Sequence, residues 1–437
     1  MNTIKYIDQL ILFEAIRNDD IASRLAGVSH DTTETTLEEA IRGVYFTTQR
    51  ALLGNIGNGE ISGNYLQDHL CRVIAGEENI FARMSEKGVY KDLRRGMAAA
   101  EITAALDFEA KSVLMLAASE IKLISGVYRF DFIKITGAAD GRNVAAAPIS
   151  GSGALSRREQ VHKAMMQSKS IDAAIMLANY YQSYGSGIFE TAPALYAEDE
   201  GLVPVKCPDP ITMDDLIGYE SQKRMLIDNA NILMSGTQAN NMLLYGDSGT
   251  GKSSSAKALL NLYSAQGLKM ISVAKDKINL IPGILAQIEG RGMKFIIFID
   301  DLSFEENENE YKVFKSIMEG RIIPRPKNTI FIVTTNRKNI VKEVWNDRND
   351  EDDVRRRDNI QEKRSLSDRF GITLIYSAPD QNEYLAIVKS MAGKAGLHLP
   401  VDELAAEALK WEIRHGGRSG RTARQFVDYK IGIERIR

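Results

Sequence analysis

One stretch of eight residues, 246–253, combines the residue types that bind phosphate. It reads GDSGTGKS and fits the pattern GxxxxGK[ST], in which glycines let backbone N–H groups point at phosphate oxygens. Lys252 would bring positive charge to the β and γ phosphates, and the Ser253 hydroxyl would ligate Mg²⁺. The stretch follows the apolar run MLLY and opens an expected helix over 252–265, the strand–loop–helix setting that such a site requires. The alternative is a glycine-rich turn without a ligand. The residues predicted to contact the nucleotide are Gly246, Asp247, Ser248, Gly249, Thr250, Gly251, Lys252, Ser253 and Ser254.

Two carboxylates follow a second apolar run. Residues 295–301 read FIIFIDD, so five apolar residues of an expected strand carry Asp300 to the carboxyl edge of a sheet. There Asp300 could hold the Mg²⁺ that Ser253 also contacts. The alternative is a strand end that faces water. Together with the loop at 246–253, the pair predicts a Mg²⁺-dependent nucleoside triphosphate site.

From residue 213 onward, apolar strands alternate with helical segments. This alternation predicts an α/β fold with a parallel five-stranded sheet covered by helices on both faces. From about Asp380 the pattern is helical only. The expected strands are Met242–Tyr245, Met270–Val273, Phe295–Ile299, Ile330–Thr334 and Ile372–Tyr376.

The first part of the chain is mostly amphipathic helix. Apolar residues recur at three- and four-residue steps over Asp68–Met84 and Ala99–Ile124, and helical periodicity returns over Arg157–Tyr184. The Gly- and Ser-rich stretch 145–155 predicts a loop or hinge. Short extended runs closed by prolines over 185–210 indicate a domain boundary.

Composition describes an ordinary globular chain of 437 residues, long enough for two to four domains. Its 55 basic and 58 acidic residues nearly cancel, so no global field favours nucleic acid or an anionic membrane as the partner. Cys71 and Cys207 are isolated, which favours reduced thiols over a disulfide or zinc framework. No apolar run approaches the ~20 residues of a spanning helix, and we expect a soluble cytoplasmic protein without membrane insertion. The mixed-charge run 346–363 is expected to be a solvated loop.

Several phrases of the sequence resemble the AAA+ ATPases, and most closely the bacterial family DUF815. They follow one another in order from Asp209 to the end of the chain. The resemblance implies an AAA+ P-loop NTPase core over 213–378 and a helical lid over 379–437. The resemblance does not explain the N-terminal region. For that region the helical periodicity and the prolines described above predict a mainly α-helical domain over 1–185 and an extended linker over 186–212. The phrases are DPITMDDLIGYESQKRMLIDN, NNMLLYGDSGTGKSSSAKALLN, IFIDDLSFEENENEYKVFKSIMEGRI, RPKNTIFIVTTNRKN, SLSDRFG and GGRSGRTARQFV.

The resemblance implies roles for residues outside the phosphate loop. Ile217, Gly218 and Tyr219 occupy the position of the adenine-contacting segment, or else make a core contact at the start of a helix. Asn336 ends the run IFIVTTN and matches the sensor 1 residue, which orients the attacking water. Asn is also a common turn residue at strand ends.

Two arginines would complete the resemblance. Arg369 in LSDRFG matches the arginine finger, which reaches a nucleotide bound by a neighbouring subunit and so implies a homo-oligomer, a ring or partial ring. The alternative is a surface arginine paired with Asp368. Arg421 in GRSGRTARQF matches sensor 2 on the lid, although helix periodicity does not separate it from Arg418 or Arg424.

Two departures from the AAA+ pattern bear on mechanism. Asp301 stands where AAA+ proteins usually have the glutamate that polarises water, and its shorter side chain predicts slow hydrolysis. Glu305 or Glu306 could substitute if the chain folds back. The segment that grips polypeptides in threading unfoldases reads VAKDKINLIPGIL here and has no aromatic residue, which argues against translocation by that device. Lys275 and Lys277 in this segment could face a pore and touch an acidic or nucleic-acid ligand, or simply be solvated.

These residues favour an oligomeric AAA+ ATPase that uses ATP and Mg²⁺ to remodel an unknown protein or nucleic-acid client, recruited by the N-terminal helices. A slow ATP-dependent switch or scaffold is the second hypothesis, and Asp301 is its signal. A loader or remodeller that acts on DNA is the third, and the near-neutral charge counts against it. A small-molecule kinase is disfavoured because it needs no sensor, finger or lid.

Overall fold

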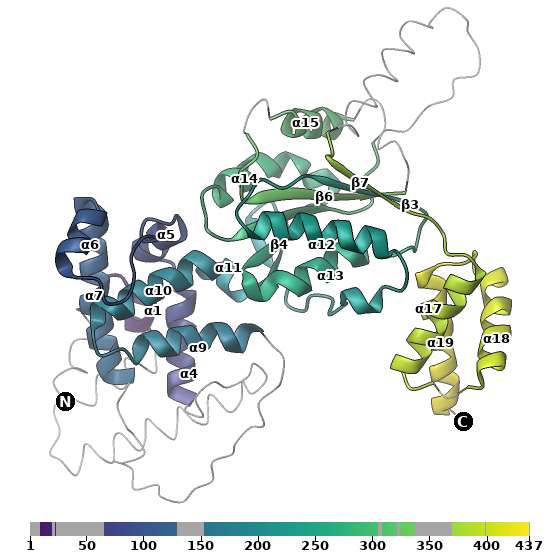
Figure 1. The fold of residues 1–437 in the computed structure, drawn as a ribbon, viewed down its shortest axis with the longest axis horizontal. Helices are drawn as coiled ribbons and strands as arrows, with labels where there is room; N and C mark the ends of the chain where they lie inside the picture. Colours follow the sequence, from purple (N-terminus) through teal and green to yellow (C-terminus); the bar gives the residue numbers. More distant parts are fainter. Residues whose placement is uncertain are drawn as a thin grey trace, which may run out of the picture. The chain divides into compact units, whose positions relative to one another are not determined.

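The computed structural model describes residues 9–19, 22, 65–128, 153–304, 308–320, 324–336, 369–397 and 399–436 (Figure 1). The mixed-charge run 346–363 and most of the expected hinge at 145–155 lie outside them. The chain forms two compact units. The first comprises residues 1–192 with the short segments 265–267 and 290–293, and the second comprises the remainder.

The first unit is helical. Its central helix, α10, packs against α5, α7 and α9, and buries Ala173, Leu177 and Tyr181 in the apolar core. The expected mainly α-helical N-terminal region is therefore confirmed for the described residues. The helices are α1 (Glu14–Arg17), α4 (Tyr65–Gly76), α5 (Ile80–Glu86), α6 (Ala99–Ala105), α7 (Phe108–Tyr128), α9 (Gly153–Met165), α10 (Ser170–Tyr184) and α11 (Gly187–Thr191).

Polar caps divide two of the helices expected from the sequence. The expected helix over 68–84 is two helices, because the Asn79 side chain accepts a backbone N–H three residues on, at 2.9 Å, and starts α5. The expected helix over 99–124 divides where Asp107 accepts the equivalent bond at 2.8 Å. Apolar periodicity continues across both caps, which is why the pattern predicted single helices.

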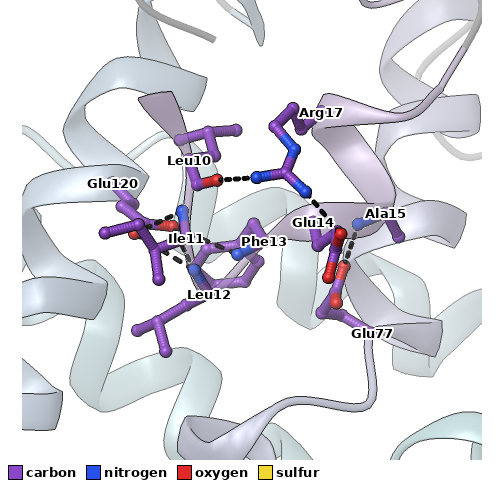
Figure 2. A network of polar contacts seen from close by, with 9 residues as sticks. All are labelled: Leu10, Ile11, Leu12, Phe13, Glu14, Ala15, Arg17, Glu77 and Glu120. Atoms are coloured by element: carbon purple, nitrogen blue, oxygen red, sulfur yellow. Dashed lines mark hydrogen bonds and ion pairs between the residues drawn. The ribbon is translucent and has the colours of Figure 1, made fainter. Parts of the chain in front are cut away.

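Two buried glutamates hold the segment that leads into α1 (Figure 2). The Glu120 carboxylate of α7 accepts hydrogen bonds from three successive backbone N–H groups, those of residues 11–13, at 2.9–3.1 Å. Glu77, which follows α4, accepts the Ala15 N–H at 2.9 Å. Burial raises the pKa of Glu77 to about 7, assisted by the negative charges of Glu14 and Glu120 and opposed by the Ala15 bond.

The second unit is centred on a seven-stranded sheet of order β2-β1-β4-β5-β6-β3-β7. All neighbouring strands are parallel except β1 and β2. The five strands expected from the sequence are all present, and the α/β fold is confirmed. The strands are β1 (Ala194–Glu198), β2 (Gly201–Pro204), β3 (Met242–Gly246), β4 (Leu268–Ser272), β5 (Lys294–Ile299), β6 (Thr329–Thr335) and β7 (Ile372–Tyr376).

The β1–β2 hairpin corrects two expectations, the five-stranded sheet and the extended linker over 186–212. Leu195 of β1 pairs with Ile271 of β4, so the hairpin extends the parallel sheet. The prolines over 185–210, which indicated a loop, are compatible with a hairpin at the edge of the sheet. Pro204 ends β2, an exposed edge strand on which a missing N–H disrupts no ladder.

Helices cover both faces of the sheet (Figure 1). Ile330 and Ile332 of β6 pack in a cluster with residues of α12 (Glu220–Met234) and α13 (Lys252–Tyr263). Phe331, between them, points to the opposite face, where its ring centroid lies 6.4 Å from that of Phe314 in α15 (Asn309–Met318). Burial on both faces explains why the strands are continuous apolar runs. The remaining helix, α14, spans Ile281–Ile288.

Three helices follow β7 and form the lid: α17 (Gln381–Lys394), α18 (Val401–Arg414) and α19 (Gly420–Ile436). They enclose an apolar core of their own in which Tyr384 is fully buried. Asp380 and Glu383 form a capping box that starts α17, with bonds of 2.8 and 2.9 Å. None of the described helices is long and apolar enough to cross a membrane.

Glu77→Gln tests the anchoring of α1. Folding raises the pKa of Glu77. The contribution of this carboxyl group to stability is therefore complete at pH values below the ordinary pKa of glutamate, and it is lost as pH rises through about 7. The amide can still accept the Ala15 N–H but cannot ionise. Hydrogen exchange of amides 11–15 should therefore be similar in both proteins at about pH 5 and better protected in the variant at about pH 8. An equal difference at both pH values would contradict this assignment.

Candidate nucleotide-binding site

The carboxyl ends of β5, β6 and β3 meet at one edge of the sheet. Since these strands are parallel neighbours, Asp300 after β5, Asn336 after β6 and the loop after β3 lie together. They border a cavity of about 520 Å³, within the ~300–1,000 Å³ typical of small-molecule sites.

Most of the residues predicted from the sequence line this cavity. Gly218, Gly246 and Asp247 belong to the same segments but are not among its lining residues, and Arg369 lies elsewhere. The predicted residues in the lining are Ile217, Tyr219, Ser248, Gly249, Thr250, Gly251, Lys252, Ser253, Ser254, Asp300, Asp301, Asn336 and Arg421.

Gly246 lies against β7 at a distance that only glycine allows. Its φ is 141°, and a Cβ at this position would lie 2.0 Å from the Tyr376 carbonyl oxygen. The Asp247 N–H donates to the same oxygen at 2.9 Å. The chain then turns so that α13 begins at Lys252, and the first residues of this helix face the cavity. Their N–H groups have no partner within the helix, so they are suited to bind phosphate.

Lys252 is 6% exposed, and its ammonium is held by three oxygens. Nζ donates to the carbonyl oxygens of Gly246 and Asp247 at 2.9 and 2.7 Å, and to Asn336 Oδ1 at 2.9 Å. Burial lowers the pKa of Lys252, while nearby carboxylates oppose this shift. All three acceptors are neutral, so an anionic phosphate oxygen would be a stronger partner for the same ammonium.

Asp300 is fixed by two hydroxyl groups. Ser253 Oγ and Thr334 Oγ1 each donate to Asp300 Oδ1 at 2.5 Å. A serine hydroxyl beside a carboxylate is the oxygen donor set that Mg²⁺ uses at phosphate sites, so these residues fit the ion. Among the described residues no three Asp, Glu, His or Cys side chains gather as a metal cage.

Asp301 has a left-handed backbone, with φ of 50°. Its N–H donates to Thr334 Oγ1 at 2.8 Å, and its Oδ1 accepts a hydrogen bond from Asn336 Nδ2 at 2.7 Å. Aspartate is enriched several-fold in this conformation among residues other than glycine. The backbone thus gives a physical reason for aspartate here, and Asn336 bridges Asp301 to Lys252.

Part of the cavity lining is apolar. Leu216 and Ile217 line the cavity together with Ile387 and Met391 of the lid helix α17, and such side chains suit an aromatic base. Tyr219 lies beside them, and its hydroxyl donates to the Ser377 carbonyl at 2.6 Å, at the hinge between β7 and the lid. Burial raises the pKa of Tyr219 to about 12, so the hydroxyl remains a donor at neutral pH.

The lid contributes Arg421 and Arg424 to the cavity. Arg418 is not among the lining residues, since its Nε donates to both carboxylate oxygens of Glu412 at 2.7 and 3.0 Å. The structure therefore separates Arg418 from the other two candidates for the lid arginine. The backbone N–H of Arg421 donates to the Gly249 carbonyl at 3.4 Å, so the first turn of α19 contacts the phosphate loop.

The other predicted residues lie away from the cavity or are already paired. Arg369 forms an ion pair of 3.2 Å with Glu319. Lys275 pairs with Glu308 at 2.6 Å, and Lys277 pairs with Asp199. Glu305 and Glu306, the alternatives to Asp301, lie outside the described residues.

Two contributions to the site were missed in the sequence. Thr334 is buried and contacts both Asp300 and Asp301. The only indication of this role in the sequence was a hydroxyl side chain two residues before Asn336. Asp247 acts through its side chain, which accepts the Ala378 N–H at 2.7 Å and joins the phosphate loop to the lid hinge. No local pattern marks a contact between residues so far apart in sequence.

A P-loop after β3, an acid after β5, a polar side chain after β6, which lies between these two strands, and a helical lid define an AAA+ P-loop NTPase fold. A family comparison agrees with the sequence. The chain belongs to the family described as "Protein of unknown function (DUF815)", whose model matches residues 190–434, and the expected membership is confirmed.

Similar solved structures include the RuvB Holliday junction branch migration motor of Thermotoga maritima, at 20% identity and TM-score 0.36 over 50% of this chain and 63% of that one. They also include the FIGL-1 AAA domain in complex with ADP, at 17% identity and TM-score 0.37 over 52% and 74%. The third is C. elegans PCH-2, at 16% identity and TM-score 0.34 over 49% and 63%. The chain thus spans less than two thirds of the RuvB and PCH-2 chains. No curated protein matches it.

Thr334→Val tests the arrangement of the two acids. Valine keeps the shape but leaves the Asp301 N–H and an Asp300 oxygen without their buried hydroxyl partner, a loss worth ~1–3 kcal/mol. Calorimetric titration should show ATP binding in the presence of Mg²⁺ weakened about tenfold or more, with little change in its absence. Thr334→Ser, which keeps the hydroxyl, should bind as the wild type does. Equal binding by the valine and serine variants would refute the role of this hydroxyl.

Proposed function

We propose that this protein binds ATP with Mg²⁺ in the cavity and hydrolyses it, and that the resulting movement of the lid acts on a macromolecular client. The observation that carries the proposal is the set of contacts joining Lys252, Asn336 and Asp301 around the phosphate loop. A nucleoside triphosphate suits this lining, because its base fits the apolar residues and its phosphates fit the loop. ATP is preferred on the family resemblance.

Different residues of the chain bind the phosphates, bind the ion and act on the attacking water. Lys252 and the N–H groups that open α13 hold the phosphates, and Ser253 with Asp300 holds the ion. Bound Mg²⁺ would supply neutralisation of charge on the phosphates. Asp301 accepts a proton from the attacking water. Asn336 orients Asp301 and this water.

A second copy of the chain is part of the proposal. Arg369 precedes β7, whereas the cavity lies at the carboxyl end of the sheet. A strand of five residues spans ~16 Å, more than an arginine side chain bridges. This distance supports action on the nucleotide of another subunit and a homo-oligomer, as expected for an arginine finger.

A slow switch is the second candidate, and the short Asp301 side chain bound to Asn336 favours it. DNA loading gains no support, because Lys275 and Lys277 are paired within the protein.

Turnover of purified protein separates the two candidates. We expect steady phosphate release that Lys252→Ala lowers by about 100-fold or more, since the variant loses the charge at the phosphates. Lys410→Ala, on the exposed surface of the lid, is the matched control and should retain the wild-type rate. Stoichiometric ATP that remains bound without release would favour the switch. If Lys252→Ala released phosphate at the wild-type rate, the site assignment would be wrong.

A further inference from the structure

We propose that Glu319 is a positioning residue that orients Arg369 toward the nucleotide site of a second copy of the chain. The inference rests on the proposed trans role of Arg369. It adds a residue to which neither the family pattern nor the sequence gave a role.

The ion pair joins a buried carboxylate to a half-exposed guanidinium. The Glu319 side chain is 9% exposed, whereas that of Arg369 is 42% exposed. Glu319 directly follows α15, and its N–H donates to the Lys315 carbonyl at 2.9 Å, so the helix end sets its backbone. Phe314 buries the same helix against the sheet. The carboxylate is therefore placed by the fold before the guanidinium reaches it.

The contact suits orientation rather than burial. It uses Nη2 of Arg369, and a guanidinium has five N–H donors in a rigid plane, so the plane can be fixed while other donors remain to meet an anion. An arginine side chain otherwise samples many rotamers, and few of them place the plane correctly. Solvent screens the pair on the Arg369 side, so its contribution to stability is small. Glu319→Gln keeps the shape of the buried side chain, and we therefore expect this variant to fold and to lose activity.

Mixed oligomers test the proposal. Lys252→Ala subunits bind no ATP productively but supply Arg369, and Arg369→Ala subunits bind ATP but supply no finger. Each should be inactive alone, and co-expressed oligomers purified through a separate tag on each variant should recover turnover. Adding Glu319→Gln to the Lys252→Ala subunit should lower the recovered kcat roughly 10- to 100-fold and leave the KM for ATP unchanged. Adding it to the Arg369→Ala subunit should change nothing.

Controls separate positioning from structure. Glu310→Gln, on the same helix, should not reduce recovery when added to the Lys252→Ala subunit. Glu319→Asp should restore part of the loss, since it keeps the charge. Equal losses from Glu319→Gln in either subunit, or no loss from either, would overturn the positioning role while the trans role of Arg369 stands. If the two single variants recovered no activity together, the trans role itself would fail and the inference with it.

Discussion

The site depends on one close approach, that of Gly246 to the Tyr376 carbonyl oxygen. No side chain fits there, and the neighbouring Asp247 N–H bonds to the same oxygen. The contact joins the end of β3 to the end of β7, where the chain leaves the sheet for the lid. The phosphate loop and the lid hinge are consequently parts of one backbone arrangement.

Several polar contacts use this arrangement. The Asp247 carboxylate accepts the Ala378 N–H, and the Tyr219 hydroxyl donates to the Ser377 carbonyl, so the phosphate loop and Tyr219 are both hydrogen-bonded to the hinge. Lys394 of the lid pairs with Asp215, which lowers the pKa of Asp215 to about 2.

The sequence predicted the parts of the site that local chemistry defines. A phosphate loop needs glycines and a lysine at fixed spacing, so residues 246–253 were recognisable. Thr334, Glu319 and the hairpin β1–β2 were not, because their roles come from tertiary neighbours far away in sequence. The anchoring of residues 11–13 by Glu120 is of the same kind, since no periodicity marks a buried acceptor 107–109 positions away.

Under the proposed function, the site becomes catalytic when a second copy supplies Arg369. The rate of phosphate release per subunit, measured across a dilution series at saturating ATP and Mg²⁺, tests it most directly. The proposal predicts a rate per subunit that rises with protein concentration and then reaches a plateau as subunits associate. A constant rate per subunit down to concentrations at which sedimentation shows only monomers would contradict it.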